Sequence, residues 1–409
     1  MNILILSQYY PPEIGAPQAR LSELAKRIIC YGHQVSVLTA MPNYPIGRIH
    51  NGYRGIYTTE QIDGIKVYRT FIYPTQRTNF LHRLTNYFSF VISSSVIGSF
   101  VLPEFDFIMV ESPPLFLGLS ALWLSYIKKA QLIFNVSDLW PESAVVLGVL
   151  NRNSFSYRVS SYLDKLFYRK SWLVTGQSKS ILHDIATRFP QCQVYHLSNG
   201  VDTCLFHSDT KNEEAKKKLS ANDKTVILYA GLHGLAQGLD QVIDAAIEFA
   251  ENQEIHFVFV GDGPEKKKLQ KRVVDLGLKN VLFIPPMPRA EIPEILASAD
   301  IAIVPLKKHL IGAVPSKIYE AMASSVPIIL LAEGEAAEIV ENYEAGIVVS
   351  FGDIAGLVTS IHNLANHAHL RQKMGSNGRK AAELYFDRDH IVKDFVKHLE
   401  QSIHHVRTP

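Results

Sequence analysis

The chain has 409 residues, of which 47% are hydrophobic and 20% charged, and its formal net charge at pH 7 is +2. These values are ordinary for folded globular proteins and exclude a largely disordered chain. The three cysteines are far apart and follow no metal-ligand spacing, so neither a disulfide scaffold nor a cysteine metal centre is predicted. A chain of this length usually forms two domains of about 200 residues each.

Charge is unevenly distributed along the chain. Residues 1–198 contain 18 Lys and Arg against 11 Asp and Glu, and the remainder contains 23 against 28. The basic first half predicts an anionic partner. Because nucleic acid would normally require a denser cationic cluster, an anionic membrane surface fits at least as well, and no nucleic-acid partner is expected. Sparse cysteines and an apolar start, Met1–Leu6, without a basic leader predict a cytoplasmic protein.

The first half alternates strands and helices. A strand at Ile3–Leu6 leads into a Gly/Pro-rich loop and a helix with Leu21, Leu24 and Ile28 on one face. A second strand at Val35–Leu38 completes a βαβ unit, and the pattern predicts a doubly wound α/β sheet. Further strands are expected at 107–110, 132–136, 173–175 and 194–197, with helices at 115–127 and 157–170.

Two segments of the first half mix apolar, aromatic and basic residues. The tract Phe88–Leu102 is too short and too rich in serine to predict a membrane span, but it follows Arg77, His82 and Arg83. The segment 155–172 combines aromatic residues with four cations. Both segments fit a helix lying at a lipid headgroup boundary, and both equally fit a helix packed on a core.

The second half repeats the same plan. A turn at Ser198–Asp202 predicts the domain boundary, so the predicted domains are 1–198 and 199–385, with a final helix in 386–409 returning to the first domain. Strands are expected at 225–230, 256–260, 281–284, 301–304, 328–331 and 346–349, with a helix at 239–248. The repeated plan predicts two doubly wound domains. Two such domains leave a cleft between the carboxyl edges of their sheets, and small ligands favour clefts at domain interfaces.

The segment Pro315–Ala323 carries the most informative motif. Pro and Ser open a helix with Lys317 and Glu320 three positions apart on one face. Lys317 together with the helix N-terminus can hold a diphosphate, and Glu320 can accept hydrogen bonds from ribose hydroxyls. The alternative is a surface ion pair of small energetic value.

Glycine turns follow two strands of the second half. The backbone N–H groups of Gly231, His233 and Gly234 could hold phosphate, and the His233 side chain could add a donor or a positive charge. An ordinary glycine turn is the alternative. Gly261-Asp262-Gly263-Pro264 predicts a tight turn, because Pro264 and a missing third glycine break the dinucleotide fingerprint and disfavour a nicotinamide enzyme.

In addition to Lys317, two carboxylates in the first half of the chain are candidate catalytic groups. Asp138 follows the strand at 132–136 at the ligand-facing edge, although it could instead precede a helix that has Pro141 near its first turn. Glu13 lies in the loop after the first strand and is a candidate acid or base. Asp387-Arg388-Asp389 has the form of a metal motif, but it precedes the last helix, so capping is the better explanation. No metal site and no cofactor are expected.

Read in order, several motifs resemble glycosyltransferase family four over nearly the whole chain. Within the family the chain is most similar to bacterial transferases of O-antigen and capsule assembly, particularly the L-fucosamine transferases. The motifs are the glycine loop near Gly15, Asp138-Leu139-Trp140-Pro141, Asn199–Phe206, Gly231–Gly238, Gly261–Pro264 and Pro315–Ala323.

The resemblance implies a GT-B fold, retention of anomeric configuration, no metal, and a nucleotide sugar held by the second domain. Lys317 would contact the donor diphosphate and Glu320 the ribose. The other expected donor-binding residues are Gly15, Gly231, His233, Gly234, Gly312, Ala313 and Val314. The chain departs from the family at Leu232, His233 and Gln237, where many relatives have Arg or Lys, at Gly312, which replaces a Glu, and at Asp138, which replaces a His.

The expected activity is transfer of a sugar, N-acetyl-L-fucosamine, from a UDP-sugar to an undecaprenyl-diphosphate-linked saccharide in O-antigen biosynthesis. The expected location is the cytoplasmic face of the inner membrane, with peripheral association. Two alternatives remain open. One is a UDP-sugar epimerase of the same architecture, and the other is an assembly protein that binds nucleotide sugar without catalysis, as the missing Arg, Lys and Glu would permit.

Overall fold

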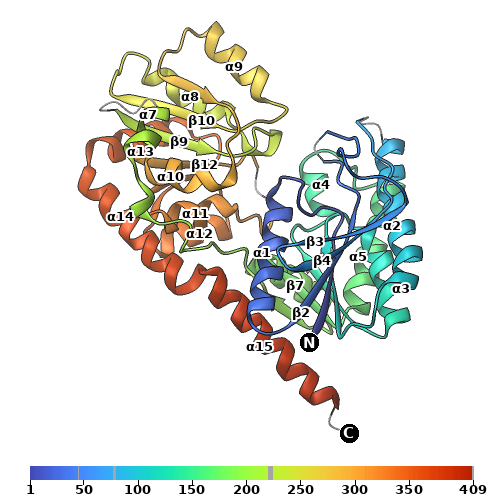
Figure 1. Cartoon of the computed structure of the whole chain (residues 1–409). Helices are drawn as coiled ribbons and strands as arrows, with labels where there is room; N and C mark the ends of the chain where they lie inside the picture. The colour runs from blue at the N-terminus through green and yellow to red at the C-terminus, as the bar shows by residue number, and fades with distance from the viewer. Residues whose placement is uncertain (45, 77–79, 220–223, 309, 408–409) are drawn as a thin grey trace. The chain divides into compact units, whose positions relative to one another are not determined.

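The computed structural model describes residues 1–44, 46–76, 80–219, 224–308 and 310–407. The chain folds into two compact units. Unit 1 is Met1–Ser198 with Val392–Pro409, and unit 2 is Asn199–Ile391 (Figure 1). The first boundary lies at the residue pair predicted from sequence, and the second lies six residues beyond the predicted end at 385.

Unit 1 is built on an eight-stranded sheet in the order β3-β4-β2-β1-β5-β6-β7-β8, in which only β3 is antiparallel to its neighbour. Residues of β5 are all buried, as expected for parallel strands covered on both faces. The strands are β1 Asn2–Leu6, β2 Gln34–Ala40, β3 Tyr57–Ile62, β4 Ile65–Thr70, β5 Phe107–Ser112, β6 Gln131–Val136, β7 Leu173–Gly176 and β8 Val194–His196.

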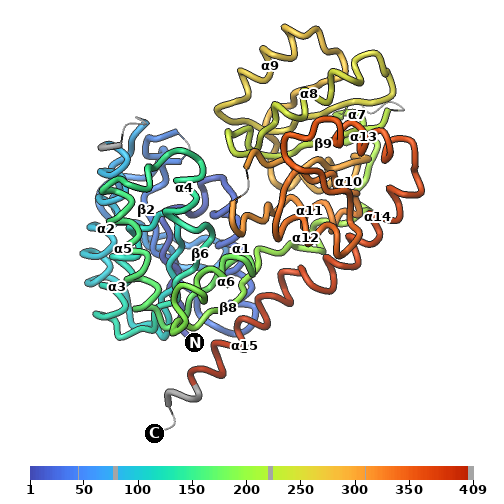
Figure 2. Tube along the Cα trace, turned by 180° about the vertical axis from the view of Figure 1, so that it is seen from behind, coloured from blue at the N-terminus to red at the C-terminus, as the bar shows by residue number. Residues whose placement is uncertain are grey.

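Three helices of unit 1, α2, α3 and α5, contribute to one apolar core with alternate residues of the strands (Figures 1 and 2). Phe90 of α2, Leu124 of α3 and Phe167 of α5 are fully buried in this core. The helices are α1 Ala16–Cys30, α2 Phe80–Val101, α3 Leu117–Lys128, α4 Glu142–Val146, α5 Phe155–Lys170 and α6 Lys179–Arg188.

The sequence predicted six strands of unit 1, and the structure confirms each of them while adding β3 and β4. Residues 88–101 of the tract Phe88–Leu102 lie in α2, which is buried on one side and exposed on the other. Phe90 is fully buried, whereas Phe100 is 85% exposed. Within the described residues, His82–Val101 of α2 is also long and apolar enough to cross a membrane, with mean hydropathy 1.3. Arg77 lies outside the described residues.

Unit 2 contains a six-stranded parallel sheet in the order β11-β10-β9-β12-β13-β14. Numbered within the unit, this is the 3-2-1-4-5-6 order of dinucleotide-binding folds. The strands are β9 Thr225–Ala230, β10 Ile255–Val260, β11 Val281–Ile284, β12 Ile301–Pro305, β13 Ile328–Leu331 and β14 Gly346–Val349, all at positions predicted from sequence.

Helices of unit 2 flank the sheet, and each long strand is followed by a loop leading into a helix. They are α7 Glu213–Lys218, α8 Asp240–Glu248, α9 Lys266–Asp275, α10 Ile292–Ala297, α11 Ser316–Ala323, α12 Glu335–Asn342, α13 Ile354–Asn366 and α14 Ala368–Ala381. Short 3-10 turns lie at Ser208–Thr210, Leu235–Gln237 and Arg289–Glu291, and a π-helical turn lies at Ala382–Phe386.

The last helix, α15 Arg388–Arg407, begins in unit 2, and its residues from Val392 onward belong to unit 1. Asp387 caps its start, because one side-chain oxygen accepts the backbone N–H groups of Asp389 at 2.9 Å and His390 at 3.2 Å. The other side-chain oxygen accepts the Thr203 hydroxyl. The capping interpretation of this aspartate is therefore confirmed.

Candidate functional site

The carboxyl edge of the unit 2 sheet brings the predicted donor motif together. The order of strands reverses between β9 and β12, and ligands of doubly wound sheets bind at such a switch point. The loop after β9 contains Gly231–Gly234, and the chain after β12 leads to α11 with Lys317 and Glu320. Two segments about 85 residues apart in sequence therefore meet at the predicted place.

Lys317 lies in the first turn of α11, with its side chain running over the start of the β9 loop. Its Nζ atom is 5.5 Å from the centre of the Tyr229 ring. No hydrogen bond or ion pair to this ammonium is found among the described residues. Burial lowers the pKa of Lys317, and the charge of Glu320 opposes that shift. A partly buried cation without a counter-ion favours binding of an anion.

Gly231 is required by the path of the Lys317 side chain. A Cβ atom at Gly231 would lie 2.3 Å from Lys317 Cε and 2.6 Å from Nζ, and its φ of 148° is one that other residues rarely adopt. Gly261 packs in turn on Gly231, since a Cβ there would lie 2.0 Å from the Gly231 carbonyl oxygen. The tight turn predicted at Gly261–Pro264 therefore packs against the Gly231–Gly234 loop and supports it.

The His233 side chain is fully buried between Tyr229, Phe259 and Phe283. Among the described residues, neither ring nitrogen has a partner at hydrogen-bond geometry. Burial, with the charge of Lys266, lowers the pKa of His233 to about 4, so the ring is neutral at pH 7. The positive charge considered for His233 from sequence is therefore not available in this conformation, and the side chain acts as an apolar support for the loop.

The four-residue loop offers fewer free amides than the sequence suggested. The Gly231 amide donates to the Val260 carbonyl at 2.8 Å, and the His233 amide donates to the Asp262 carbonyl at 2.8 Å. Within the described part of the chain, the amides left without such a partner are those of Leu232 and Gly234. The phosphate nest predicted for this loop is thus reduced to these two groups, supplemented by the N-terminus of α11.

Glu320 and the segment before α11 complete the predicted donor set. Glu320 is partly buried and forms no ion pair with Lys317 within 4 Å, so the small surface ion pair considered from sequence is absent from this part of the described chain. Gly312 has a φ of 73°, while Val314 is buried in the core of unit 2. Ala313 donates its amide to the Leu310 carbonyl at 3.0 Å. Residues 312–314 therefore offer a ligand few side-chain atoms.

Sequence reasoning missed Lys307 at the same edge. Its backbone amide donates to the Ala236 carbonyl at 2.9 Å, and its Nζ atom lies 4.0 Å from an Asp240 side-chain oxygen. A Cβ at Gly238 would lie 3.2 Å from Lys307 Cα. The available signal was its position two residues beyond the carboxyl end of β12, where ligands of such sheets bind.

In unit 1, the Glu13 carboxylate fastens loops at the carboxyl edge of the sheet. One oxygen accepts the amides of Asn43 at 2.7 Å and Tyr44 at 2.8 Å, and the other accepts the Tyr10 amide at 3.3 Å. Burial raises the pKa of Glu13, and these three N–H groups oppose the shift. Because both oxygens already accept hydrogen bonds, positioning of the loops explains Glu13 better than proton transfer does.

Asp138 and Gly15 lie in loops of the same edge. Burial raises the pKa of the Asp138 carboxyl, as a general acid or base would need. Asp138 does not cap α4, whose N-cap residue is Pro141. Gly15 is the N-cap of α1 with an extended backbone, and a Cβ there would lie 2.4 Å from the Gln18 side-chain oxygen. The catalytic role of Asp138 and the donor contact of Gly15 remain predictions.

A polar network beside Asp138 was not predicted. The buried Glu111 carboxylate, at the end of β5, accepts hydrogen bonds from Arg20 of α1, Asn135 and Ser137. Asn135 in turn accepts the Thr175 hydroxyl at 2.7 Å. The network ties β5, β6 and β7 to α1, and it leaves Glu111 with its hydrogen-bonding capacity largely used.

No group of three or more His, Cys, Asp or Glu side chains able to hold a metal occurs in the ranges that the structure describes. The residues placed at the unit 2 edge are two lysines, glycines, backbone amides and one glutamate. This set suits a diphosphate joined to a diol-bearing group, because cations and N–H donors face the phosphate while the carboxylate accepts from hydroxyls.

Comparison with known proteins agrees with this chemistry. Residues 210–381 match the family described as "Glycosyl transferases group 1". An Escherichia coli K12 protein, "Putative colanic acid biosynthesis glycosyl transferase WcaI", is 24% identical over 407 residues, which cover 97% of this chain and 99% of the relative.

Solved structures share the fold over almost the whole chain. Anabaena Alr3699/HepE in complex with UDP and glucose has a TM-score of 0.74 at 19% identity, covering 98% of this chain and 100% of that one. Sucrose-phosphate synthase from Thermosynechococcus elongatus has a TM-score of 0.74 at 16% identity, covering 98% and 99%. The chain therefore has the GT-B fold and is similar to glycosyltransferases over nearly its whole length, while the match to the group 1 glycosyl transferases covers residues 210–381 of its second unit.

Proposed function

We propose that the protein transfers N-acetyl-L-fucosamine from its UDP-activated form to an undecaprenyl-diphosphate-linked saccharide during O-antigen or related polysaccharide biosynthesis. The E. coli relative is named for colanic acid biosynthesis, which supports a polysaccharide product. The Anabaena relative binds UDP and UDP-glucose, which supports a uridine nucleotide. The choice of sugar rests on the sequence resemblance to L-fucosamine transferases.

The observation that carries the proposal is the Lys317 ammonium, which lies on Gly231 and Tyr229 at the switch point without a counter-ion among the described residues. Negative charge develops on departing UDP as the sugar bond breaks. A cation already in place stabilises that charge without further reorganisation of the site. Glu320, one turn further along α11, would accept the ribose hydroxyls and so fix the orientation of the nucleotide.

The remaining features of the proposal follow from the resemblance. The reaction would retain the anomeric configuration and need no metal. Asp138 is the residue of unit 1 that would act as acid or base. The protein would work at the cytoplasmic face of the inner membrane as a peripheral protein. The product's anomeric coupling by NMR and full activity in EDTA are the measurements that check the first two features.

The decisive test compares Lys317→Ala with Lys317→Arg and with the surface control Lys271→Ala on α9. We expect Lys317→Ala to weaken UDP binding, measured by calorimetry, by about 1.5–3 kcal/mol, or roughly ten- to a hundredfold. Lys317→Arg should recover part of this and Lys271→Ala should have no effect. Unchanged UDP binding and transfer in Lys317→Ala would rule out the site.

Screening UDP- and GDP-sugars against a synthetic lipid-diphosphate-linked N-acetylglucosamine, with mass-spectrometric detection, identifies the donor. The same screen separates the two alternatives. An isomerised UDP-sugar formed from donor alone would indicate an epimerase. Thermal stabilisation by UDP without turnover on any acceptor would indicate a nucleotide-sugar-binding assembly protein.

A further inference from the structure

The outward side of α2 and α3 carries an exposed apolar surface. Ile92, Val96 and Phe100 are spaced four residues apart on α2 and are 62%, 54% and 85% exposed. This spacing puts them in one stripe along the helix. Trp123, Tyr126 and Ile127 of α3 are 50%, 80% and 41% exposed. We call these six residues the α2–α3 crest.

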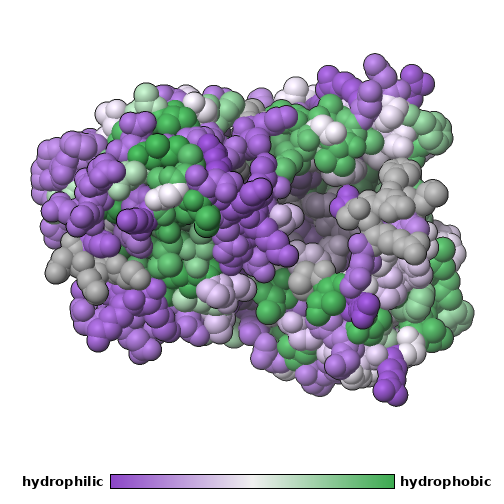
Figure 3. Space-filling model, turned by 90° about the horizontal axis from the view of Figure 1, so that it is seen from above, coloured by the Kyte–Doolittle hydropathy of each residue, from purple (hydrophilic) through white to green (hydrophobic). Residues whose placement is uncertain are grey.

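The two halves of the crest lie side by side because the helices are joined by hydrogen bonds. The Trp123 indole N–H donates to the Ser99 hydroxyl at 2.9 Å. The Lys128 ammonium donates to the carbonyl oxygens of Ser99 at 2.8 Å and Leu102 at 2.6 Å, at the end of α2. In the space-filling view of Figure 3, hydrophobic residues (green) lie at the surface along the right-hand edge, the side on which Figure 1 draws α2 and α3.

Charge around the crest is almost entirely positive. The helices α2, α3 and α5, of 22, 12 and 16 residues, contain one carboxylate, Asp164, and its side chain is buried. The next carboxylate after α2 is Glu104, in the loop that follows. Exposed cations on these helices and at the end of α3 are Arg83, Lys129, Arg158, Lys165, Arg169 and Lys170.

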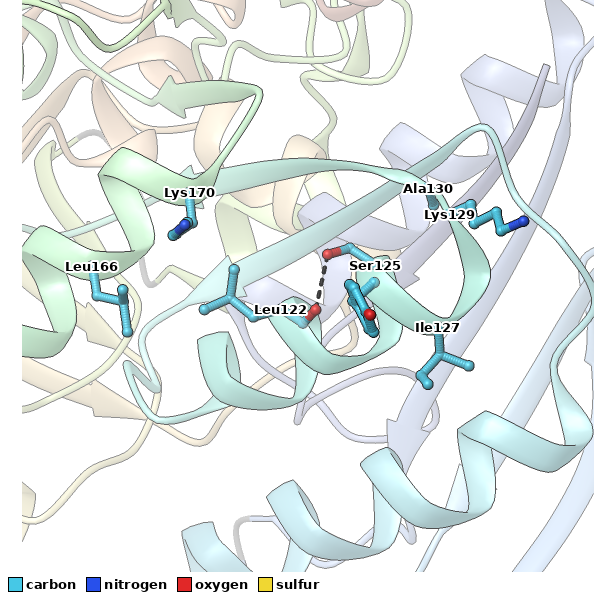
Figure 4. A pocket seen from close by; sticks show the side chains of 8 residues that line it. Leu122, Ser125, Ile127, Lys129, Ala130, Leu166 and Lys170 are labelled. Carbon is cyan, nitrogen blue, oxygen red and sulfur yellow. Dashed lines mark hydrogen bonds between the residues drawn. The ribbon is translucent and has the colours of Figure 1, made fainter.

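A groove between α3 and α5 adjoins the crest and combines both properties. Its volume is about 860 Å³, and its lining includes Leu122, Leu166, Lys129 and Lys170, together with Tyr126 and Ile127 of the crest. In Figure 4, Lys170 and Leu166 lie at one side of the lining residues and Lys129 lies at the other, with Leu122 between the two lysines. The groove lies toward the amino edge of the sheet, because Lys129 lies two residues before β6 and Lys170 lies three residues before β7.

We propose that the α2–α3 crest, with the cations of the α3–α5 groove, docks the protein on an anionic lipid bilayer. The apolar and aromatic side chains would enter the boundary between headgroups and acyl chains, while Lys129 and Lys170 meet lipid phosphates. A second copy of the chain fits less well, because a two-fold contact through this face would bring cations against cations without facing carboxylates. The proposal supplies the surface for the peripheral association included in the proposed function.

The test measures co-sedimentation of the full chain with two kinds of vesicle, phosphatidylcholine alone and phosphatidylcholine with about one-third phosphatidylglycerol. We expect binding mainly to the anionic vesicles, weakening as salt is raised. Phe100→Ser with Tyr126→Ser should reduce binding about tenfold, because each change removes an aromatic side chain from the lipid boundary. The matched control is Val274→Ser with Leu276→Ser, which changes two exposed apolar residues at α9 in unit 2.

A charge pair checks the groove. Lys129→Gln with Lys170→Gln should reduce binding to anionic vesicles severalfold, because each change removes a cation that would meet lipid phosphates. Lys267→Gln with Lys271→Gln, two exposed lysines of α9, should leave vesicle binding unchanged. Binding that is absent in wild type, or equal in crest and control variants, would overturn the proposal. So would a dimer, seen by sedimentation velocity, that Phe100→Ser with Tyr126→Ser dissociates.

Sugar transfer to a water-soluble acceptor analogue, measured on the same variants, separates this inference from the proposed function. We expect the crest variants to retain this activity, because the changes lie on the outward face of the helices. Vesicle binding with no transfer to any acceptor would refute the proposed function and leave the docking surface intact. Transfer with vesicle binding unaffected by the crest changes would do the reverse.

Discussion

The carboxyl edges of the two sheets carry charged residues of opposite sign. The carboxylates of unit 1 have hydrogen-bond partners, whereas Lys317 of unit 2 lacks one among the described residues. In unit 1, Glu13 accepts three backbone N–H groups, and Glu111 accepts hydrogen bonds from Arg20, Asn135 and Ser137. In unit 2, the Lys317 ammonium lies against Gly231 and the Tyr229 ring and has no hydrogen-bonded or ion-paired partner among the described residues. Polar groups with satisfied partners hold loops in place, whereas an unsatisfied cation is ready for a ligand.

This difference assigns separate roles to the two edges. The unit 2 edge can bind an anion without first breaking internal hydrogen bonds, because Lys317, the two free amides and the N-terminus of α11 have no such partner among the described residues. Burial raises the pKa values of both Glu13 and Asp138 in unit 1, but only Glu13 has both oxygens occupied by backbone donors. Asp138 therefore remains the better candidate for chemistry at that edge.

Gly231→Ala gives the largest expected effect on this comparison. The added Cβ would displace the Lys317 ammonium, so UDP binding should weaken roughly ten- to a hundredfold, about as much as in Lys317→Ala. Gly277→Ala is the control, because Gly277 also has a positive φ, of 65°, but open space around it. Calorimetric titration with UDP measures the effect. Equal UDP affinity in Gly231→Ala and wild type would show that the Lys317 position is unimportant.

Glu13→Gln tests whether the unit 1 carboxylate positions loops or transfers protons. Gln has one acceptor oxygen, so at least one of the N–H groups of Tyr10, Asn43 and Tyr44 loses its partner. We expect the free energy of unfolding to fall by roughly 1–3 kcal/mol. UDP binding, which depends on unit 2, should not change. Chemical denaturation and transfer kinetics are the measurements.

The pH profile separates the two roles of Glu13. A proton-transfer role predicts that the variant loses the limb of the transfer rate that Glu13 titrates, with stability unchanged. A positioning role predicts lower stability and a slower rate with the same profile. Finding the first pattern would make Glu13 a catalytic residue and contradict the assignment made from its hydrogen bonds.

Most of the fold could be predicted because parallel strands buried on both faces are short, nearly continuous apolar runs. The strand β10, with the sequence Ile-His-Phe-Val-Phe-Val, is an example, and all of its residues are buried. The strand β3 was missed because it is an edge strand whose residues alternate between exposed and partly buried, and its polar sequence resembles a loop. The following β4 was missed with it.

The donor site could be predicted only in part. Lys317 and Gly231 follow neighbouring strands, so strand order alone brings them together. The burial of His233 depends on Phe259 of β10 and Phe283 of β11, and no local pattern shows that these rings enclose it.

His233→Phe gives the smallest expected effect at neutral pH and the sharpest test of the unit 2 assignment. Phe fills the cage of Tyr229, Phe259 and Phe283 without two buried nitrogens that lack partners, so stability at pH 7 should stay equal or rise. UDP affinity should not change, because the ring does not supply a positive charge. Affinity that falls about tenfold would place the His233 ring on the phosphate.

The pH dependence of stability checks the same residue. The folded-state pKa of His233 is lowered from 6.5 to about 4, so the unfolded chain binds the proton more tightly. Wild type should therefore lose stability as pH falls from about 6.5 to about 4, by at most about 3 kcal/mol, and His233→Phe should lack this component. Urea unfolding of both proteins across that range measures the difference. Parallel stability curves would mean that His233 is solvated and able to take up a proton in the folded protein, and its ring would then be available to a departing diphosphate.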